Sequence, residues 1–99
     1  MQITVNFRNT KPSDALREYA LKRVGKIEKL LIKPEDGQVT LGVDKDDHTA
    51  QVILHANGET FAGKHAAEDM YAAIDLVVDK VERQARRYKE KLINHRGRP

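Results

Sequence analysis

Apolar residues recur with two different periods along this 99-residue chain. In residues 2–8, Ile3, Val5 and Phe7 alternate with polar residues, which predicts a strand with one buried face. In residues 69–98, apolar residues recur every three or four positions, which predicts one long amphipathic helix with a single side facing a core. The apolar stripe of this helix consists of Met70, Ile74, Val77, Val81, Ala85, Tyr88 and Leu92.

An earlier helix is predicted from about Asp14 to Leu31. Ser13 is a good N-cap, and the negative charge of Asp14 suits the first turn of a helix. Gly25 weakens the middle of this helix and is expected to mark a close contact with a neighbouring element. The run Pro34 to Gly37 should end the helix and turn the chain. The expected apolar face comprises Leu16, Tyr19, Ala20, Val24 (or the stem of Arg23), Ile27, Leu30 and Leu31.

Three further strands are predicted between the helices. Gln38 to Val43 and Ala50 to Ala56 alternate, and Asp44 to His48 form a polar connection between them. Asn57-Gly58 is a strong hairpin signal that leads into the last strand. A two-residue loop there places Ala56 opposite Glu59, Leu54 opposite Phe61 and Val52 opposite Gly63.

The element order is therefore strand, helix, strand, strand, strand, helix. We expect a single α+β domain over residues 1–99 with βαβββα topology: a four-stranded mixed sheet with both helices packed on one face. A second helix that is continuous from about Ala67 to Asn94 is longer than any of the strands, since it rises about 1.5 Å per residue. Its C-terminal end should project past the sheet or lie against the first helix.

The composition is that of a soluble globular protein, with 39% hydrophobic and 33% charged residues. No apolar run approaches the length of a membrane span, and the N-terminus does not resemble a secretion signal. The chain has no cysteine, so disulfides, thiolate catalysis and sulfur-ligated metals are excluded. These features indicate a cytoplasmic protein with no membrane partner.

Charge is distributed unevenly along the chain. Residues 1–79 hold 10 Lys/Arg and 13 Asp/Glu, whereas residues 80–99 hold 8 and 2. This polarity favours a polyanionic partner that docks in one orientation, although basic residues also complement the C-terminal dipole of a helix. Asp69, Asp75 and Asp79 make the start of the last helix acidic. Its basic positions are Lys80, Arg83, Arg86, Arg87, Lys89, Lys91, Arg96 and Arg98.

The first helix adds a stripe of four lysines that contains no acidic residue. Their spacing of four, three and four places them on one side of the helix, if the helix extends that far. Like charges in a row repel each other, so the stripe fits phosphate binding better than a mixed surface would. The four residues are Lys22, Lys26, Lys29 and Lys33.

No catalytic or metal-binding constellation is evident. The histidines are scattered over the predicted connection, opposite strand faces and the chain end, so we expect neither a metal site nor a cofactor. Glycine-rich phosphate loops and nucleophile motifs are absent, which argues against an enzyme. Asp79 with Arg83, and Glu82 with Arg86, are expected to form ion pairs within the last helix. Because the exposed sheet face lacks aromatic pairs, phosphate and shape recognition are favoured over base stacking.

Several motifs resemble the ribosome hibernation-promoting factor family, which includes the ribosome-associated inhibitor proteins. These are D-M-Y-A-A-I-D at residues 69–75, K-E-K-L at 89–92, A-L-R-E at 15–18, H-T at 48–49 and L-H-A-N-G at 54–58. The resemblance covers essentially the whole chain. It implies a βαβββα protein that binds the small ribosomal subunit in the channel for messenger and transfer RNA, blocks translation and preserves inactive ribosomes in stationary phase or stress.

The resemblance also implies which residues contact RNA and which partners are involved. The chain looks like a short hibernation factor that is monomeric off the ribosome and promotes ribosome dimers together with a small modulation factor. Its ligand would be ribosomal RNA with the neighbouring ribosomal proteins. Two alternatives stay open, a general structured-RNA-binding module and an acidic-protein-binding module. The implied RNA-binding residues are Lys22, Lys26, Lys29, Lys80, Arg83, Arg86, Arg87 and Lys91.

Overall fold

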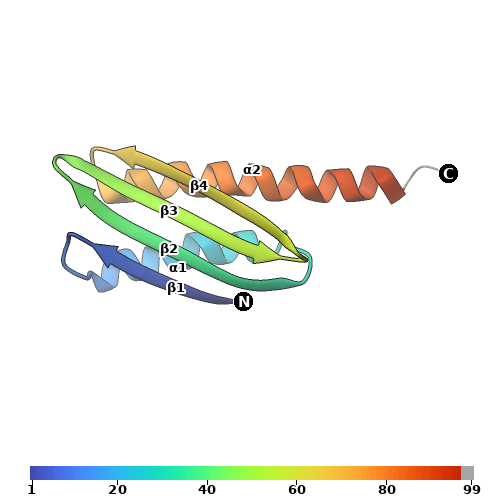
Figure 1. The fold of residues 1–99 in the computed structure, drawn as a ribbon, viewed down its shortest axis with the longest axis horizontal. Coiled ribbons are helices and arrows are strands. Elements are labelled where there is room, and N and C mark those ends of the chain that lie inside the picture. The colour runs from blue at the N-terminus through green and yellow to red at the C-terminus, as the bar shows by residue number, and fades with distance from the viewer. Residues whose placement is uncertain (97–99) are drawn as a thin grey trace.

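The computed structural model describes residues 1–96, and the side chains of residues 1–93. Six elements follow one another in the predicted order and form one sheet covered by two helices (Figure 1). The βαβββα, α+β prediction is therefore confirmed. The elements are β1 (Gln2–Arg8), α1 (Asp14–Glu28), β2 (Pro34–Asp44), β3 (Asp47–Ala56), β4 (Glu59–Ala67) and α2 (Met70–Arg96).

The sheet has the strand order β1-β2-β3-β4. β1 and β2 are parallel because α1 crosses over between them, whereas tight turns make the following pairs antiparallel. The β3–β4 hairpin has the predicted register, with Leu54 opposite Phe61. Asn57 and Gly58 both have positive φ angles, 52° and 76°, as the right-handed twist of a two-residue hairpin requires.

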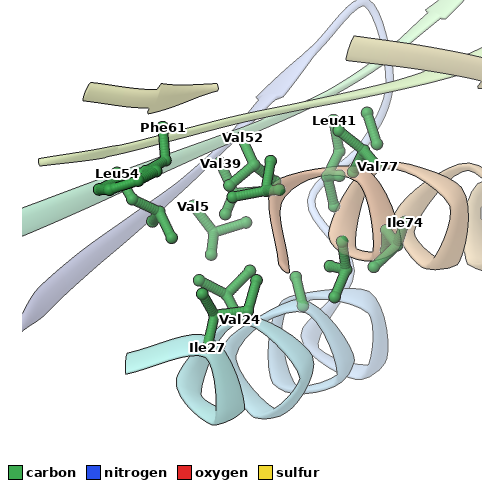
Figure 2. Packing of buried hydrophobic residues seen from close by; sticks show 14 of the residues in the cluster. Val5, Val24, Ile27, Val39, Leu41, Val52, Leu54, Phe61, Ile74 and Val77 are labelled. Atoms are coloured by element: carbon green, nitrogen blue, oxygen red, sulfur yellow. The ribbon is translucent and has the colours of Figure 1, made fainter. Parts of the chain in front are cut away.

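Both helices cover the same face of the sheet, as the one-sided apolar patterns predict. Strand residues such as Val39, Val52 and Leu54 point toward Val24 of α1 and Ile74 of α2 (Figure 2). Burial removes this apolar surface from water, which is the main driving force for the fold. The buried set contains the predicted stripe from Met70 to Ala85 and adds Ala73 and Val78; Tyr88 packs against its edge.

Helix α1 begins where the sequence predicts but ends earlier. The Ser13 hydroxyl accepts a hydrogen bond from the backbone N–H of Leu16 at 3.2 Å, which confirms Ser13 as the N-cap. The helix ends at Glu28, and the N–H groups of Leu30 and Leu31 bond to carbonyls three residues back, which tightens the last turn. Lys33 therefore lies outside α1, in left-handed backbone with φ 49°. Gly25 makes no close contact, so that prediction was wrong.

The segment expected to be a turn, Pro34 to Gly37, is the beginning of β2. Tertiary pairing overrides its turn-like composition, because Asp36 pairs with β1 on one side and β3 on the other. Gly37 faces the core, where a Cβ atom would lie 2.7 Å from Leu54 Cδ2. β3 likewise begins at Asp47, so the predicted connection Asp44 to His48 shrinks to a tight turn and His48 joins the strand.

Helix α2 begins at Met70 rather than at Ala67, which is the last residue of β4. The Asp69 carboxylate accepts the backbone N–H of Ala72 at 2.9 Å and so supplies the N-cap. The helix is 27 residues long, about 40 Å at 1.5 Å per residue, and its C-terminal turns project past the sheet (Figure 1). The predicted extension of this helix to Arg98 lies outside the described residues.

Each edge strand of the sheet carries a side chain from a helix on its outer backbone groups. Arg17 of α1 donates to the carbonyl of Val5 in β1 at 3.1 Å. Gln84 of α2 binds both backbone groups of Ala62 in β4: its amide donates to the carbonyl at 2.7 Å, and its oxygen accepts the N–H at 3.0 Å. These bonds tie each helix to the nearest sheet edge.

Within residues 1–96, neither helix is apolar enough along its length to cross a bilayer.

The core assignment predicts different effects for two isoleucines on the same helix. Ile74→Ala should lower the free energy of unfolding by about 2–5 kcal/mol, because it deletes fully buried atoms and leaves a cavity. Ile93→Ala should change it by less than about 0.5 kcal/mol, because Ile93 is 59% exposed. Urea denaturation followed by circular dichroism measures both values. Equal losses in the two variants would contradict the described packing of α2.

Candidate nucleic-acid interface

All eight predicted RNA-binding residues are exposed. The three lysines of α1 lie opposite its buried residues Val24 and Ile27, so their ammonium groups point away from the sheet. Lys29 is the C-cap residue and still has helical backbone angles, which keeps it in line with Lys22 and Lys26. The early end of α1 thus shortens the predicted stripe to three lysines without breaking it.

Four basic residues of α2 form a second stripe, on the side of the helix that meets β4. Their spacing of three, four and four places them on one face. Two adjoining surface depressions run along this face and share Gln84 and Arg87; the first is lined by Lys80 and Arg83, and the second by Thr60, Phe61, Tyr88 and Lys91. We call this surface the α2–β4 groove. Its basic residues are Lys80, Arg83, Arg87 and Lys91.

Gln84 lines both depressions of the α2–β4 groove and was not among the residues predicted from the sequence. Its bidentate hydrogen bonds to Ala62 fix the rotation of α2 about its own axis against β4. The helix also approaches the strand closely at Gly63, where a Cβ atom would lie 3.2 Å from Lys80 Cδ. The sequence offered one signal for this role of Gln84: it is an uncharged polar residue beside the apolar stripe of the last helix.

The second depression of the α2–β4 groove is lined by an aromatic pair. The rings of Phe61 and Tyr88 meet edge to face with centroids 5.5 Å apart. The Tyr88 hydroxyl accepts a hydrogen bond of 3.1 Å from the side-chain amide of Asn57 at the tip of the hairpin. These contacts hold the helix turn that carries Arg87 and Lys91 on the rigid β3–β4 hairpin, just before α2 leaves the sheet.

Between the two basic stripes, Arg23 of α1 reaches across to two carboxylates of α2. Its Nε atom lies 3.2 Å from Asp75 Oδ1, and its Nη2 atom lies 3.5 Å from Asp79 Oδ1. Tyr19, one turn earlier on α1, donates its hydroxyl to Asp75 at 2.5 Å. Residues one turn apart on α1 therefore meet residues one turn apart on α2 in the same order, so the two helices run in the same direction.

The ion pairs within α2 agree only partly with the prediction. Glu82 and Arg86 pair at 3.4 Å, as expected for their spacing. Asp79 is instead held by Arg23, and within residues 1–93 it forms no ion pair with Arg83. Arg86 is the one member of the eight candidate residues that has an ion-pair partner within this range, and it lies outside the α2–β4 groove.

The surface suits binding of a polyanion. Exposed guanidinium and ammonium groups on rigid elements donate hydrogen bonds to phosphate oxygens and attract them electrostatically. In the part of the chain that the structure describes, no three metal-ligating side chains come together. Among residues 1–93, the exposed aromatic ring is that of Tyr71, which packs edge-on against Tyr19 rather than on the open face of the sheet.

Comparison with known proteins agrees with this architecture. Residues 3–93 match the model of the Ribosomal_S30AE family, described as sigma 54 modulation protein / S30EA ribosomal protein. The chain belongs to this family. The predicted relationship to the hibernation factors is thereby confirmed, and Ribosomal_S30AE proteins are not an enzyme family.

Individual proteins similar to this chain align with it over nearly their whole length. The ribosome hibernation promoting factor of Escherichia coli (strain K12) is 36% identical over 95 residues, which cover 96% of this chain and 100% of the relative. The N-terminal domain of Protein Y from Thermus thermophilus superposes with a TM-score of 0.81 at 28% identity, covering 89% of this chain and 99% of the domain.

A more distant structural neighbour supports the fold alone. A ribosomal subunit interface protein from Coxiella burnetii superposes with a TM-score of 0.80, covering 91% of this chain and 99% of the neighbour. The identity is 23%. The fold is therefore shared with a protein whose sequence has diverged widely from this one.

The contact between Tyr19 and Asp75 predicts a pH-dependent contribution to stability. The hydrogen bond to Asp75 raises the pKa of Tyr19, burial raises it further, and the charge of Arg23 acts in the opposite direction. The neutral phenol thus stabilises the fold fully below the unfolded-state pKa of about 10, and this contribution is lost as pH rises through the higher folded-state pKa. The stability difference between wild type and Tyr19→Phe should therefore shrink above about pH 10. Urea denaturation between about pH 8 and 11 measures it; a difference that stays constant across this range would contradict the hydrogen bond.

Proposed function

We propose that this chain is a ribosome hibernation factor that binds the small ribosomal subunit in the channel for messenger and transfer RNA and thereby blocks translation. The observation that carries the proposal is the α2–β4 groove, in which Lys80, Arg83, Arg87 and Lys91 lie on a helix that the fold holds rigidly. Family membership and the names of the relatives support the ribosome as the partner.

The chemistry of binding would be phosphate recognition over an extended surface. The α2–β4 groove supplies four cations, and Lys22, Lys26 and Lys29 of α1 supply three more. Seven cations spread over two helices fit a folded RNA surface in which several phosphates come close together. Arg86 would contribute less, because Glu82 already holds its guanidinium.

Inhibition of translation would result from the domain occupying the RNA channel and not from a chemical reaction. A rigid domain seated in the RNA channel excludes messenger and transfer RNA by its volume, and the projecting end of α2 extends the excluded region (Figure 1). We further propose that residues 1–99 act as one cytoplasmic domain that is monomeric off the ribosome. A small modulation factor would act alongside it to form inactive ribosome dimers in stationary phase or stress.

Binding to ribosomes should depend strongly on salt. If about six phosphates are neutralised, the logarithm of the binding constant should fall against the logarithm of salt concentration with a slope of roughly −4 to −5. Sedimentation with purified small subunits through sucrose gradients at several salt concentrations measures this slope. Protein that stays at the top of the gradient at low salt would refute ribosome binding. A general RNA-binding module would bind competing duplex RNA as well as it binds small subunits, so the duplex would displace it from them. A module that binds acidic proteins would bind neither small subunits nor duplex RNA.

Charge reversal in the groove should weaken binding without unfolding the domain. Arg87→Glu removes an exposed cation and adds an anion at the centre of the α2–β4 groove, so affinity for small subunits should fall by at least tenfold, which corresponds to about 1.4 kcal/mol or more. Lys11→Glu makes the same charge change at an exposed site before α1 and serves as the control. Binding is measured by sedimentation and folding by thermal denaturation. Equal losses of affinity in both variants would show that net charge alone, and not the groove, determines binding.

A further inference from the structure

The two basic surfaces are separated by carboxylates that would repel RNA if they were unpaired. Asp75 and Asp79 lie where α2 faces α1, and their side chains are 45% and 57% exposed. Asp79 is one helical turn before Arg83 of the α2–β4 groove. A phosphate backbone that contacts both α1 and α2 must therefore pass over these two acids.

Arg23 lies close enough to both carboxylates to reduce their combined charge from −2 to −1. Its side chain is 29% exposed, less than either carboxylate, and its Nε atom is shielded from solvent within the interhelical contact. One guanidinium spans both acids because its donors are arranged as a rigid fork. By contrast, the neighbouring Lys22 and Lys26 are exposed and point outward.

We propose that Arg23 is a positioning residue that makes the lysines of α1 and the α2–β4 groove one continuous surface for a polyanion. It does so by lowering the combined negative charge of Asp75 and Asp79 and by holding the two helices in register, while its own guanidinium remains turned toward the carboxylates. This inference rests on the proposed function for the identity of the polyanion, but the reduction in charge is a property of the chain itself.

The test removes Arg23 with and without the acids that it covers. Arg23→Met should weaken binding to small subunits about tenfold, because two carboxylates become unpaired beside the phosphates. Adding Asp75→Asn and Asp79→Asn should restore affinity to within about threefold of wild type, since nothing is left to repel the RNA. An asparagine at position 75 still accepts the Tyr19 hydroxyl, so that helix contact is kept.

Lys22→Met provides the matched control, since it removes an outward-facing cation from the adjacent position of α1. Its loss of affinity should simply add to the effect of the two Asp→Asn changes, whereas the loss from Arg23→Met should not. Thermal unfolding of every variant verifies that the proteins are folded at the assay temperature. If the triple variant binds as weakly as Arg23→Met, Arg23 contacts RNA directly or acts only through stability, and the inference is overturned.

The salt concentration at which each variant elutes from immobilised heparin is measured in parallel. The same ranking of variants is expected there, because heparin is also a polyanion. If wild type fails to bind small subunits but the heparin ranking holds, the proposed function fails while the role of Arg23 stands. The proposed charge effect is refuted if Arg23→Met elutes at the same salt concentration as wild type and if the two Asp→Asn changes shift elution no more in the Arg23→Met protein than in wild type. This conclusion holds whether or not the protein binds ribosomes.

Discussion

Burial of one face of the sheet under two helices is the constraint on which the rest of the structure depends. Each strand has a single apolar face, and each helix has a single apolar stripe, so only a two-layer arrangement removes all of them from water together (Figure 2). Once α1 and α2 lie side by side on that face, their polar residues must point either outward or toward each other. The residues that point outward form the basic surfaces, and those that point toward the other helix form the contact of Arg23 with Asp75 and Asp79.

The position of α2 along β4 decides which of its cations act together. Val77 and Val81 bury one side of the helix, and Gln84 bonds to the edge strand on the next side. A rotation of α2 by one residue would break the Gln84 contacts and move Arg83 and Arg87 out of the α2–β4 groove. The groove is therefore as rigid as the core beneath it, which favours binding of a partner with a fixed arrangement of phosphates.

Features encoded by neighbouring residues were predictable from the sequence, and features that need distant partners were not. The Asn57-Gly58 hairpin, its register and the Ser13 cap follow from local chemistry. The start of β2 does not, because its glycine is required by the packing of Leu54 from another strand. The periodicity of α1 and α2 predicted the exposure of all eight candidate residues.

The grouping of those candidate residues required the tertiary structure. Gln84 sets which side of α2 meets β4, through its hydrogen bonds to Ala62. This residue has no charge and belongs to no motif. The stem of Arg23 was predicted only as an alternative to Val24 on the apolar face; Val24 is the buried residue, and the guanidinium of Arg23 lies beside the carboxylates of α2. The spacing of Asp79 and Arg83 suggested a local pair, but a cation on the other helix holds Asp79.

The hydrogen bonds that helix side chains make to the two outer strands have a consequence for behaviour at high concentration. An open sheet edge is a template on which further strands, including those of other copies, can assemble. Here Arg17 occupies an outward carbonyl of β1, Gln84 occupies both outward groups of Ala62, and Lys64 places a charge farther along β4. These side chains protect the edges near their midpoints, which disfavours pairing with the strands of other copies.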